Sequence, residues 1–349
     1  MKTATTFVKR IAVFVLQAVL WISAVGGFAW AVGAVYLLTY LPRSFATILA
    51  IAFAGAAFCW VRKSPAPRTR QQRLAACIAA AWVATLPQQP SNQRDWAQDN
   101  LQLARVETEG DLAKIVNFRN NVYRSESDYD VNFENLEFNI NSIRRVWFVV
   151  QRFTTMEGIA HNFLTFEYTL NSKPAYFSVS VEIRREKGES FSPVKGLYRQ
   201  YELIYVVSSE QDEIGMRTVL RPEDRVFMYE VNANAHQVQQ LFTDIANRIN
   251  SLEDSPEFYH SLLNNCTNNI VAHTYKLTPE PINWLDPRIV APGYADRFAF
   301  AYGLVGNDKE SFDALQARCR IDEIARSVGI CPGFSAQIRR SADRHSGLR

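Results

Sequence analysis

A run of 31 residues without a charged side chain, residues 11–41, constrains the fold of this chain most. About 20 apolar residues suffice for a helix that crosses a bilayer, so the run predicts a transmembrane helix. Residues 44–61 form a second uncharged run of 18 residues, and residues 74–86 form a third of 13. We therefore expect residues 1–90 to be a membrane anchor with two or three transmembrane helices.

The basic residues of this anchor predict its orientation. Residues 1–90 carry nine Lys and Arg and no Asp or Glu, and five of the nine lie in the loop 62–73. The positive-inside rule places the N-terminus and this loop in the cytoplasm. Three spans then leave the rest of the chain outside the membrane, whereas two spans leave it in the cytoplasm. We expect three spans; the alternative for the third run is a buried or interfacial helix.

Charge and cysteine spacing argue against two classes of function. After residue 90 the chain has 29 Lys and Arg against 35 Asp and Glu, so the overall charge of +3 comes from the anchor. No nucleic-acid partner is expected, because the soluble part has no basic excess. The five cysteines show no CxxC or other metal-ligand spacing, so a zinc site is not expected either.

The remainder of the chain predicts an α+β fold. Apolar and polar residues alternate in 160–168 and in 176–184, with a turn at 171–174 between them, which predicts a β-hairpin. An amphipathic helix follows, with Asn234 as its N-cap. The further strands that we expect are 202–207 and 225–231. Strands in sequence followed by helices are typical of a sheet with helices packed on it.

We expect two parts after the anchor. Residues 91–305 form the α+β domain, and residues 306–349 form a C-terminal extension with one helix over 308–328 and a frayed tail. In an oxidising compartment, Cys319 and Cys331 would be close enough in sequence to pair as a disulfide.

One cysteine has the sequence context of a nucleophile. Cys266 follows Asn264 and Asn265, and apolar residues then return at helical spacing, so we expect a helix with one of the two asparagines as N-cap. Cys266 then lies in the first helical turn, where free backbone N–H groups and the helix dipole favour a thiolate. We therefore expect the pKa of this thiol to lie below its ordinary value.

A thiol nucleophile needs a base and a group that orients it. His161 lies on the first strand of the predicted hairpin and Glu182 on the second, and adjacent antiparallel strands can bring two such side chains together. Spacing alone leaves open that Cys266 is a plain core residue, that His161 is structural and that Glu182 belongs to an exposed ion pair.

Five strings of this sequence together resemble a known family. They are His161-Asn-Phe-Leu-Thr-Phe, Ser180-Val-Glu-Ile-Arg-Arg-Glu-Lys-Gly-Glu, Tyr201-Glu-Leu-Ile-Tyr-Val-Val, and Pro256-Glu-Phe-Tyr with Asn265-Cys-Thr. In this order they resemble the periplasmic domain of the Lnb-type lipoprotein N-acyltransferases, over about residues 92–303. That domain is similar to the permuted, NlpC-like branch of the papain superfamily, in which the histidine precedes the cysteine.

The resemblance implies roles for four residues. Cys266 would be the nucleophile, His161 the base and Glu182 the third member of the site, and Tyr259 would line the oxyanion site. The implied fold is a papain-like antiparallel sheet with packed helices, behind N-terminal transmembrane helices. The Lnb acyltransferases carry their membrane helices after this domain, whereas here they precede it. The resemblance therefore supports thiol acyl chemistry more strongly than lipoprotein N-acylation.

We accordingly expect a multi-pass protein of the bacterial inner membrane with its C-terminal domain in the periplasm. The expected reaction is acyl transfer or acyl hydrolysis through a thioester on Cys266, on lipoprotein or lipid, without a metal or cofactor. The alternatives are a peptidoglycan amidase or peptidase with the same site, and a non-catalytic, membrane-anchored binding module.

Overall fold

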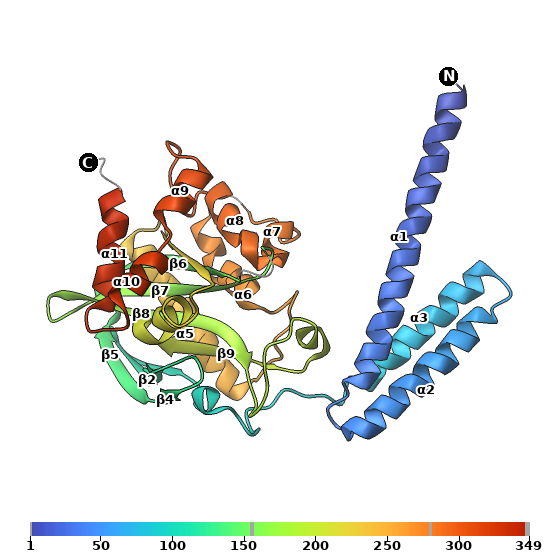
Figure 1. Ribbon diagram of the computed structural model, residues 1–349, viewed down its shortest axis with the longest axis horizontal. Helices are drawn as coiled ribbons and strands as arrows, with labels where there is room; N and C mark the ends of the chain where they lie inside the picture. The colour runs from blue at the N-terminus through green and yellow to red at the C-terminus, as the bar shows by residue number, and fades with distance from the viewer. Residues whose placement is uncertain (1, 154–156, 279–280, 346–349) are drawn as a thin grey trace. The chain divides into compact units, whose positions relative to one another are not determined.

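The computed structural model describes residues 2–153, 157–278 and 281–345 of the 349-residue chain. The chain divides into two compact units (Figure 1). The first, the anchor unit, comprises Met1–Pro90 and the short segment Val194–Gln200. The second comprises Ser91–Pro193 and Tyr201–Arg349, so the predicted domain and its C-terminal extension belong to one unit.

Three helices form the anchor unit: α1 (Lys2–Tyr36), α2 (Arg43–Arg62) and α3 (Pro67–Ala84). Small and aliphatic side chains fill the space between them, namely Ala31, Ala34, Val35, Leu38, Ala50 and Ala81. Within the described residues, Gln17–Tyr36 and Arg43–Arg62 are long and apolar enough to cross a membrane. Helix α3 does not meet that test because basic and polar residues occupy its first turns, although it covers most of the predicted third run.

An eight-stranded sheet forms the centre of the second unit, in the order β1-β2-β9-β8-β7-β6-β10, with β5 paired to β2. All neighbours are antiparallel except β2 and β9, which meet in parallel at one pair. The strands are β1 (Arg105–Glu109), β2 (Leu112–Arg119), β5 (Phe133–Asn139), β6 (Ile143–Arg152), β7 (Ala160–Leu170), β8 (Lys173–Arg184), β9 (Glu202–Ser208) and β10 (Arg225–Glu230). A separate small ribbon pairs β3 (Val122–Tyr123) with β4 (Tyr129–Asp130).

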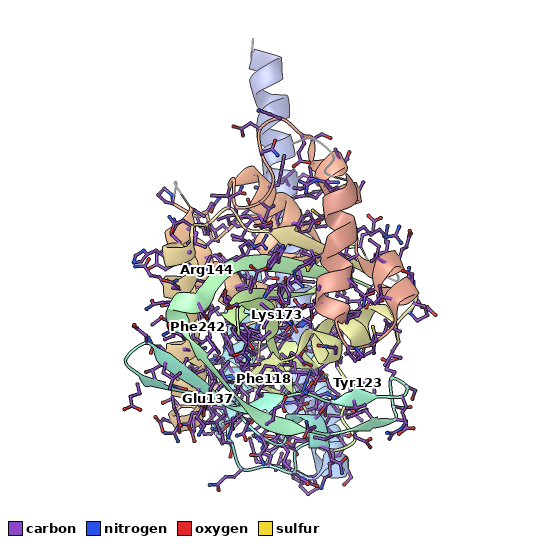
Figure 2. All side chains as sticks on the ribbon, turned by 90° about the vertical axis from the view of Figure 1, so that its left-hand side faces the viewer. Phe118, Tyr123, Glu137, Arg144, Lys173 and Phe242 are labelled. Atoms are coloured by element: carbon purple, nitrogen blue, oxygen red, sulfur yellow. The ribbon has the colours of Figure 1, made fainter. Side chains whose placement is uncertain are left out.

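Helices cover both faces of this sheet. The larger apolar core joins one face to α5 (Ala235–Asp254) and to the start of α6 (Cys266–Thr274). A smaller core joins the opposite face to α10 (Asp322–Val328) and α11 (Phe334–His345). Figure 2 shows the side chains that fill these layers. The remaining helices are α4 (Met216–Thr218), α7 (Pro287–Val290), α8 (Ala295–Ala301) and α9 (Phe312–Arg318). The predicted α+β class, with membrane-type helices first, is confirmed.

The predicted hairpin is confirmed as β7 and β8, in register from Phe163–Ser180 to Leu170–Lys173. Its turn is shorter than predicted: only Asn171 and Ser172 connect the strands, with φ angles of 50° and 61°. Left-handed conformations at both central positions are what a tight two-residue hairpin requires.

The prediction of one continuous helix over 308–328 is wrong. The chain leaves α9 at Cys319 and pairs with the edge strand β10, where Cys319 O accepts from Met228 N and Ile321 N donates to Val226 O. Backbone groups used on a strand edge cannot also serve a helix, so α10 begins only at Asp322. Cys319 and Cys331 are both free thiols, and Cys319 is buried.

Candidate functional site

Cys266 begins helix α6, as predicted, and Asn265 is the N-cap. The Asn265 side chain accepts from Asn268 N at 3.0 Å, and the Asn268 side chain accepts from Asn265 N at 3.2 Å. This reciprocal capping box satisfies two backbone donors at the helix start. It fixes the first turn of α6 and therefore the position of the thiol.

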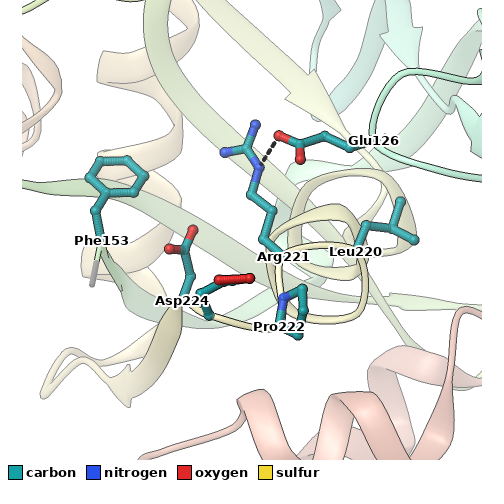
Figure 3. A pocket seen from close by; sticks show the side chains of 7 residues that line it. Glu126, Phe153, Leu220, Arg221, Pro222 and Asp224 are labelled. Carbon is teal, nitrogen blue, oxygen red and sulfur yellow. Dashed lines mark hydrogen bonds and ion pairs between the residues drawn. The ribbon is translucent and has the colours of Figure 1, made fainter. Parts of the chain in front are cut away.

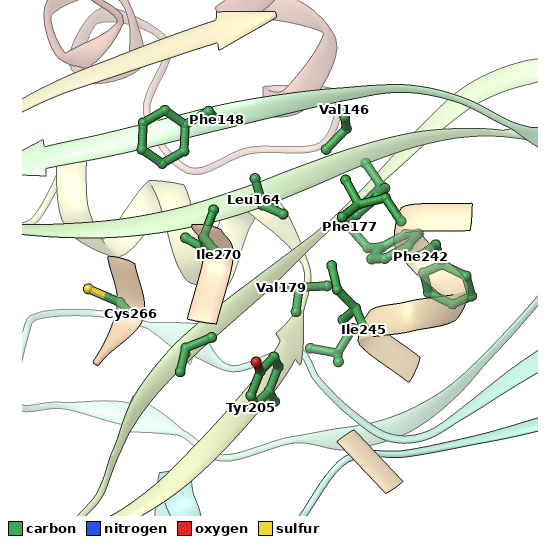
Figure 4. Packing of buried hydrophobic residues seen from close by; sticks show 14 of the residues in the cluster. Val146, Phe148, Leu164, Phe177, Val179, Tyr205, Phe242, Ile245, Cys266 and Ile270 are labelled. Atoms are coloured by element: carbon green, nitrogen blue, oxygen red, sulfur yellow. The ribbon is translucent and has the colours of Figure 1, made fainter. Parts of the chain in front are cut away.

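The thiol is buried, with only 3% of Cys266 exposed. Figure 4 shows it at the start of the helix that carries Ile270 into the apolar core beside Leu164. Burial raises the pKa of Cys266, and hydrogen bonds from backbone N–H groups, including that of Asn162, oppose this rise. The expected lowering of the thiol pKa is therefore wrong for this conformation, because desolvation outweighs the helix terminus.

A hydrogen-bonded chain links His161 to Glu182 through Ser180. The Nε2 atom of His161 lies 2.7 Å from Ser180 Oγ, which donates to Glu182 Oε1 at 3.0 Å. Ser180 has one hydroxyl proton and gives it to the carboxylate, so its oxygen accepts from Nε2–H. This leaves the Nδ1 atom of His161 unprotonated and able to act as a base.

Two arginines and a second glutamate surround this chain. Arg217 lies 2.6 Å from Glu182 and 3.0 Å from Glu213, and Arg119 lies 3.1 Å from Glu213. Burial lowers the pKa of His161 to about 3, and the positive charge of Arg217 adds to the effect. Burial opposes ionisation of Glu182, but Arg217 outweighs it and holds the pKa of that carboxyl well below its usual range. The imidazole is therefore neutral beside an ionised carboxylate.

The second glutamate behaves differently from the first. Glu213 is fully buried, and desolvation raises its pKa to about 7 although Arg217 opposes the rise. Its Oε1 atom lies 3.9 Å from Nε2 of His161. Glu213 belongs to a short π-helical segment, Gln211–Gly215, a distortion that often marks functional sites.

The thiol and the imidazole approach the same strand from opposite sides. Asn162 donates its side-chain N–H to Thr267 on α6 at 2.8 Å, whereas its neighbour His161 stacks on Phe163, which belongs to the core on the other face. Successive residues of a strand point to opposite faces. The structure thus brings His161 and Glu182 together, and none of the hydrogen bonds between described residues joins the Cys266 sulfur to the His161 ring.

The thiol nevertheless lies beside the main chain of the residue that follows His161. Pairing of β7 with β8 ends at Phe163–Ser180, and β8 continues to Arg184 beside β9 alone. The Asn162 N–H is therefore available to the Cys266 sulfur, as its effect on the thiol pKa indicates. The nitrogen of Asn162 is bonded directly to the carbonyl carbon of His161.

This part of the chain is similar to a known family of periplasmic domains. Residues 129–290 match the family model described as the Lnb N-terminal periplasmic domain. The matched segment is similar to the periplasmic domain of that family. It spans the strands and helix that carry His161, Glu182 and Cys266. Comparisons with curated proteins and with solved structures give no match.

Tyr259 lies within the matched segment. It is buried, its ring meets that of Phe191 edge-on at 6.5 Å, and its backbone N–H donates to Tyr201 O. Burial raises the pKa of Tyr259 well above its usual value, and the nearby Cys266 and Glu182 add to the rise. Tyr259 is therefore a neutral phenol.

The other histidines that flank Cys266 in sequence have structural contacts. His273 bonds Asp244 through Nδ1 at 2.7 Å and Tyr205 through Nε2 at 2.8 Å. His260 accepts from the backbone N–H groups of Leu262 and Leu263 through its Nδ1 atom. The sequence did not identify the roles of Ser180, Glu213 and Arg217. Only the position of Ser180 on the polar face of its strand and the four-residue spacing of Glu213 and Arg217 hint at them.

Ligand atoms of His161, Glu182 and Glu213 lie within 4.8 Å of one another, a spacing that a metal could use. Arg217, however, already contacts both carboxylates and supplies the balancing positive charge. A divalent ion there would have to compete with a buried guanidinium at hydrogen-bond distance. The charges therefore describe an ion-pair network rather than a metal centre.

Two cavities flank the site. The larger, about 350 Å³, is polar, and the ion pair between Arg221 and Glu126 lies on its wall (Figure 3). Asp224 on its wall accepts from Gln151, the cross-strand partner of His161. The smaller, about 30 Å³, is apolar and lies behind Thr267 on α6. The sheet face that carries His161 therefore lies near the polar cavity. The opposite face, on which α6 and Cys266 pack, lies near the apolar cavity.

Proposed function

We propose that this chain is a membrane-anchored periplasmic thiol enzyme that transfers or hydrolyses acyl groups through a thioester on Cys266. One observation carries the proposal. The Cys266 sulfur lies at a capped helix start beside the Asn162 N–H, and the preceding residue, His161, has its basic nitrogen set by Ser180 and Glu182.

In the proposed reaction, Nδ1 of His161 takes the thiol proton and the sulfur attacks the carbonyl carbon of an acyl ester. Backbone N–H groups of Asn162 and Cys266 stabilise the oxyanion, with the Tyr259 hydroxyl as a further donor. His161 returns the proton to the departing alkoxide, which leaves the acyl group on sulfur. It then takes a proton from water or an amine, which attacks the thioester and restores the free thiol.

This chemistry requires the thiol to become accessible. A rotation of the His161 side chain toward the Asn162 main chain, together with entry of substrate at the start of α6, would bring Nδ1 to the sulfur. If Nε2–H keeps its bond to Ser180 during this rotation, the Glu182 carboxylate stabilises the imidazolium that then forms. Displacement of the apolar surroundings of Cys266 would also remove the main cause of its raised pKa.

We propose three membrane crossings for the anchor. Gln88, just after α3, donates to Leu37 O at 3.1 Å, and Tyr40 donates to Ala84 O at 2.9 Å, so α3 ends beside the end of α1. If α1 ends outside the membrane, α3 does too, which agrees with a periplasmic domain.

The strongest competing function is a binding module that keeps the fold without catalysis. The raised pKa of the buried Cys266 thiol favours it, because such a thiol is a poor nucleophile. A peptidoglycan amidase or peptidase would use the same residues on a peptide carbonyl.

Intact mass spectrometry separates these functions. The full-length protein is purified from its membranes, and a fatty-acyl adduct that hydroxylamine removes is expected on Cys266 and not on Cys266→Ser. A muropeptide adduct would instead support the peptidoglycan enzyme. An unmodified thiol, also after incubation with phospholipid vesicles and isolated peptidoglycan, would favour the binding module.

A further inference from the structure

Three large apolar side chains are exposed close to Cys266. Phe191 is 46% exposed, Leu262 is 44% exposed and Leu263 is 76% exposed, and we call these three residues the apolar patch. Phe191 contacts Tyr259, and Ser261 donates to Pro193 O at 2.7 Å, so the two loops that carry the patch are joined. Leu262 and Leu263 therefore lie on the loop that leads into the thiol helix, and Phe191 lies on the loop bonded to it.

The chain continues from this patch into the anchor unit. Immediately after Pro193, the segment Val194–Gln200 belongs to the same compact unit as the membrane helices. Its Tyr198 stacks on Trp30 of α1 with ring centroids 6.3 Å apart, and Gln200 donates to Leu37 O at 2.8 Å. This segment is therefore held on the membrane-type helix near its C-terminal end.

Connectivity limits how far the patch can be from the bilayer. Tyr198 lies seven positions after Phe191 in the sequence. An extended chain covers at most about 3.6 Å per residue, so the Cα atom of Phe191 lies within about 25 Å of that of Tyr198. The limit holds for any orientation of the two units. Trp30 lies inside the candidate membrane span Gln17–Tyr36, so the ring that contacts it is at the level of the span.

We propose that the apolar patch contacts the lipid surface of the membrane and brings lipid acyl chains to the entrance of the Cys266 site. Aromatic and leucine side chains at the tips of loops bind the boundary between headgroups and acyl chains. Use of the patch by Cys266 rests on the proposed acyl chemistry, but the contact with lipid does not.

Photolabelling of the full-length protein tests this proposal. The protein is placed in nanodiscs of phosphatidylethanolamine and phosphatidylglycerol that contain a phospholipid with a diazirine in its acyl chain. After illumination and proteolysis, the peptides with Phe191 and with Leu262 and Leu263 are expected to carry lipid, as do peptides of α2. Leu170 is the matched control: it is 43% exposed, but it lies at the far end of the 11-residue strand β7, about 30 Å from the site.

Substitutions in the apolar patch, at Leu170 and at Cys266 then test whether the patch itself contacts lipid. Leu262→Asn with Leu263→Asn should reduce labelling of that peptide to the Leu170 level, and Leu170→Asn should change nothing. Cys266→Ser should label fully, because contact with lipid does not need the thiol. Wild-type protein that labels fully but carries no thioester would overturn the proposed enzyme and leave the patch standing. The proposal is overturned if the patch peptides label no more than the Leu170 peptide, or if they cross-link to another protein or a second copy instead of lipid.

Discussion

Replacement of Glu213 by glutamine should raise the free energy of unfolding of the variant, compared with that of wild type, as the pH rises. The pKa of this fully buried carboxyl is raised from 4.5 to about 7, so the folded state holds its proton more tightly than the unfolded state does. The stability contributed by that proton is present below pH 4.5 and is lost as the pH rises through about 7. A glutamine does not titrate, so its contribution to stability does not change over this pH range.

The size of the effect follows from the shift in pKa. Each pKa unit corresponds to 1.36 kcal/mol, so wild type should lose about 3 kcal/mol between pH 4.5 and pH 8 that Glu213→Gln keeps. The pH-independent effect of the substitution on Arg119 and Arg217 shifts the whole curve and leaves this difference in slope unchanged. Glu137→Gln is the control, because the Glu137 side chain is 58% exposed.

Denaturant unfolding of the full-length protein in detergent, followed by near-ultraviolet circular dichroism at several pH values, measures these curves. The quantity of interest is the difference in unfolding free energy between variant and wild type, plotted against pH. A difference that stays flat from pH 4.5 to 8, or that falls, would refute the reasoning. It would show that Arg217 and Arg119 keep Glu213 ionised throughout.

Three further predictions follow from the site and the anchor. Ser180→Ala removes the hydroxyl that joins His161 to Glu182 and should slow thioester formation about tenfold, the equivalent of one hydrogen bond. Ser180→Thr keeps the hydroxyl and should retain most of the rate. Equal rates for Ser180→Ala and wild type would exclude a role for the hydrogen-bonded chain from His161 to Glu182. His161→Ala should slow alkylation of Cys266 by iodoacetamide at neutral pH and His273→Ala should not, and the reverse result would mean that the base was assigned to the wrong histidine. A reporter active only in the periplasm should be active when fused after Trp96, and activity of a cytoplasmic reporter at that point would exclude three spans.

Local periodicity and capping were sufficient to predict several elements. Alternation along 160–184 predicted the hairpin, because a strand with one buried face must repeat every second residue. The asparagines before Cys266 predicted the helix start, because free backbone donors need a nearby acceptor. The ordered strings around His161 and Cys266 were enough to indicate the Lnb-type domain.

Contacts between distant segments decided the rest. Alternation shows that His161 and Glu182 share a face but not which face α6 covers, and only packing puts Cys266 on the other side of β7. The pKa values of His161, Glu182 and Glu213 depend on burial and on Arg217, whose position is set by a segment that follows β9. In the same way, residues 308–328 do not form one helix, because the backbone of Cys319 and Ile321 pairs with the edge strand β10. Periodicity is a property of neighbouring residues, whereas desolvation and strand-edge pairing depend on residues far apart in sequence, so only the tertiary structure could decide them.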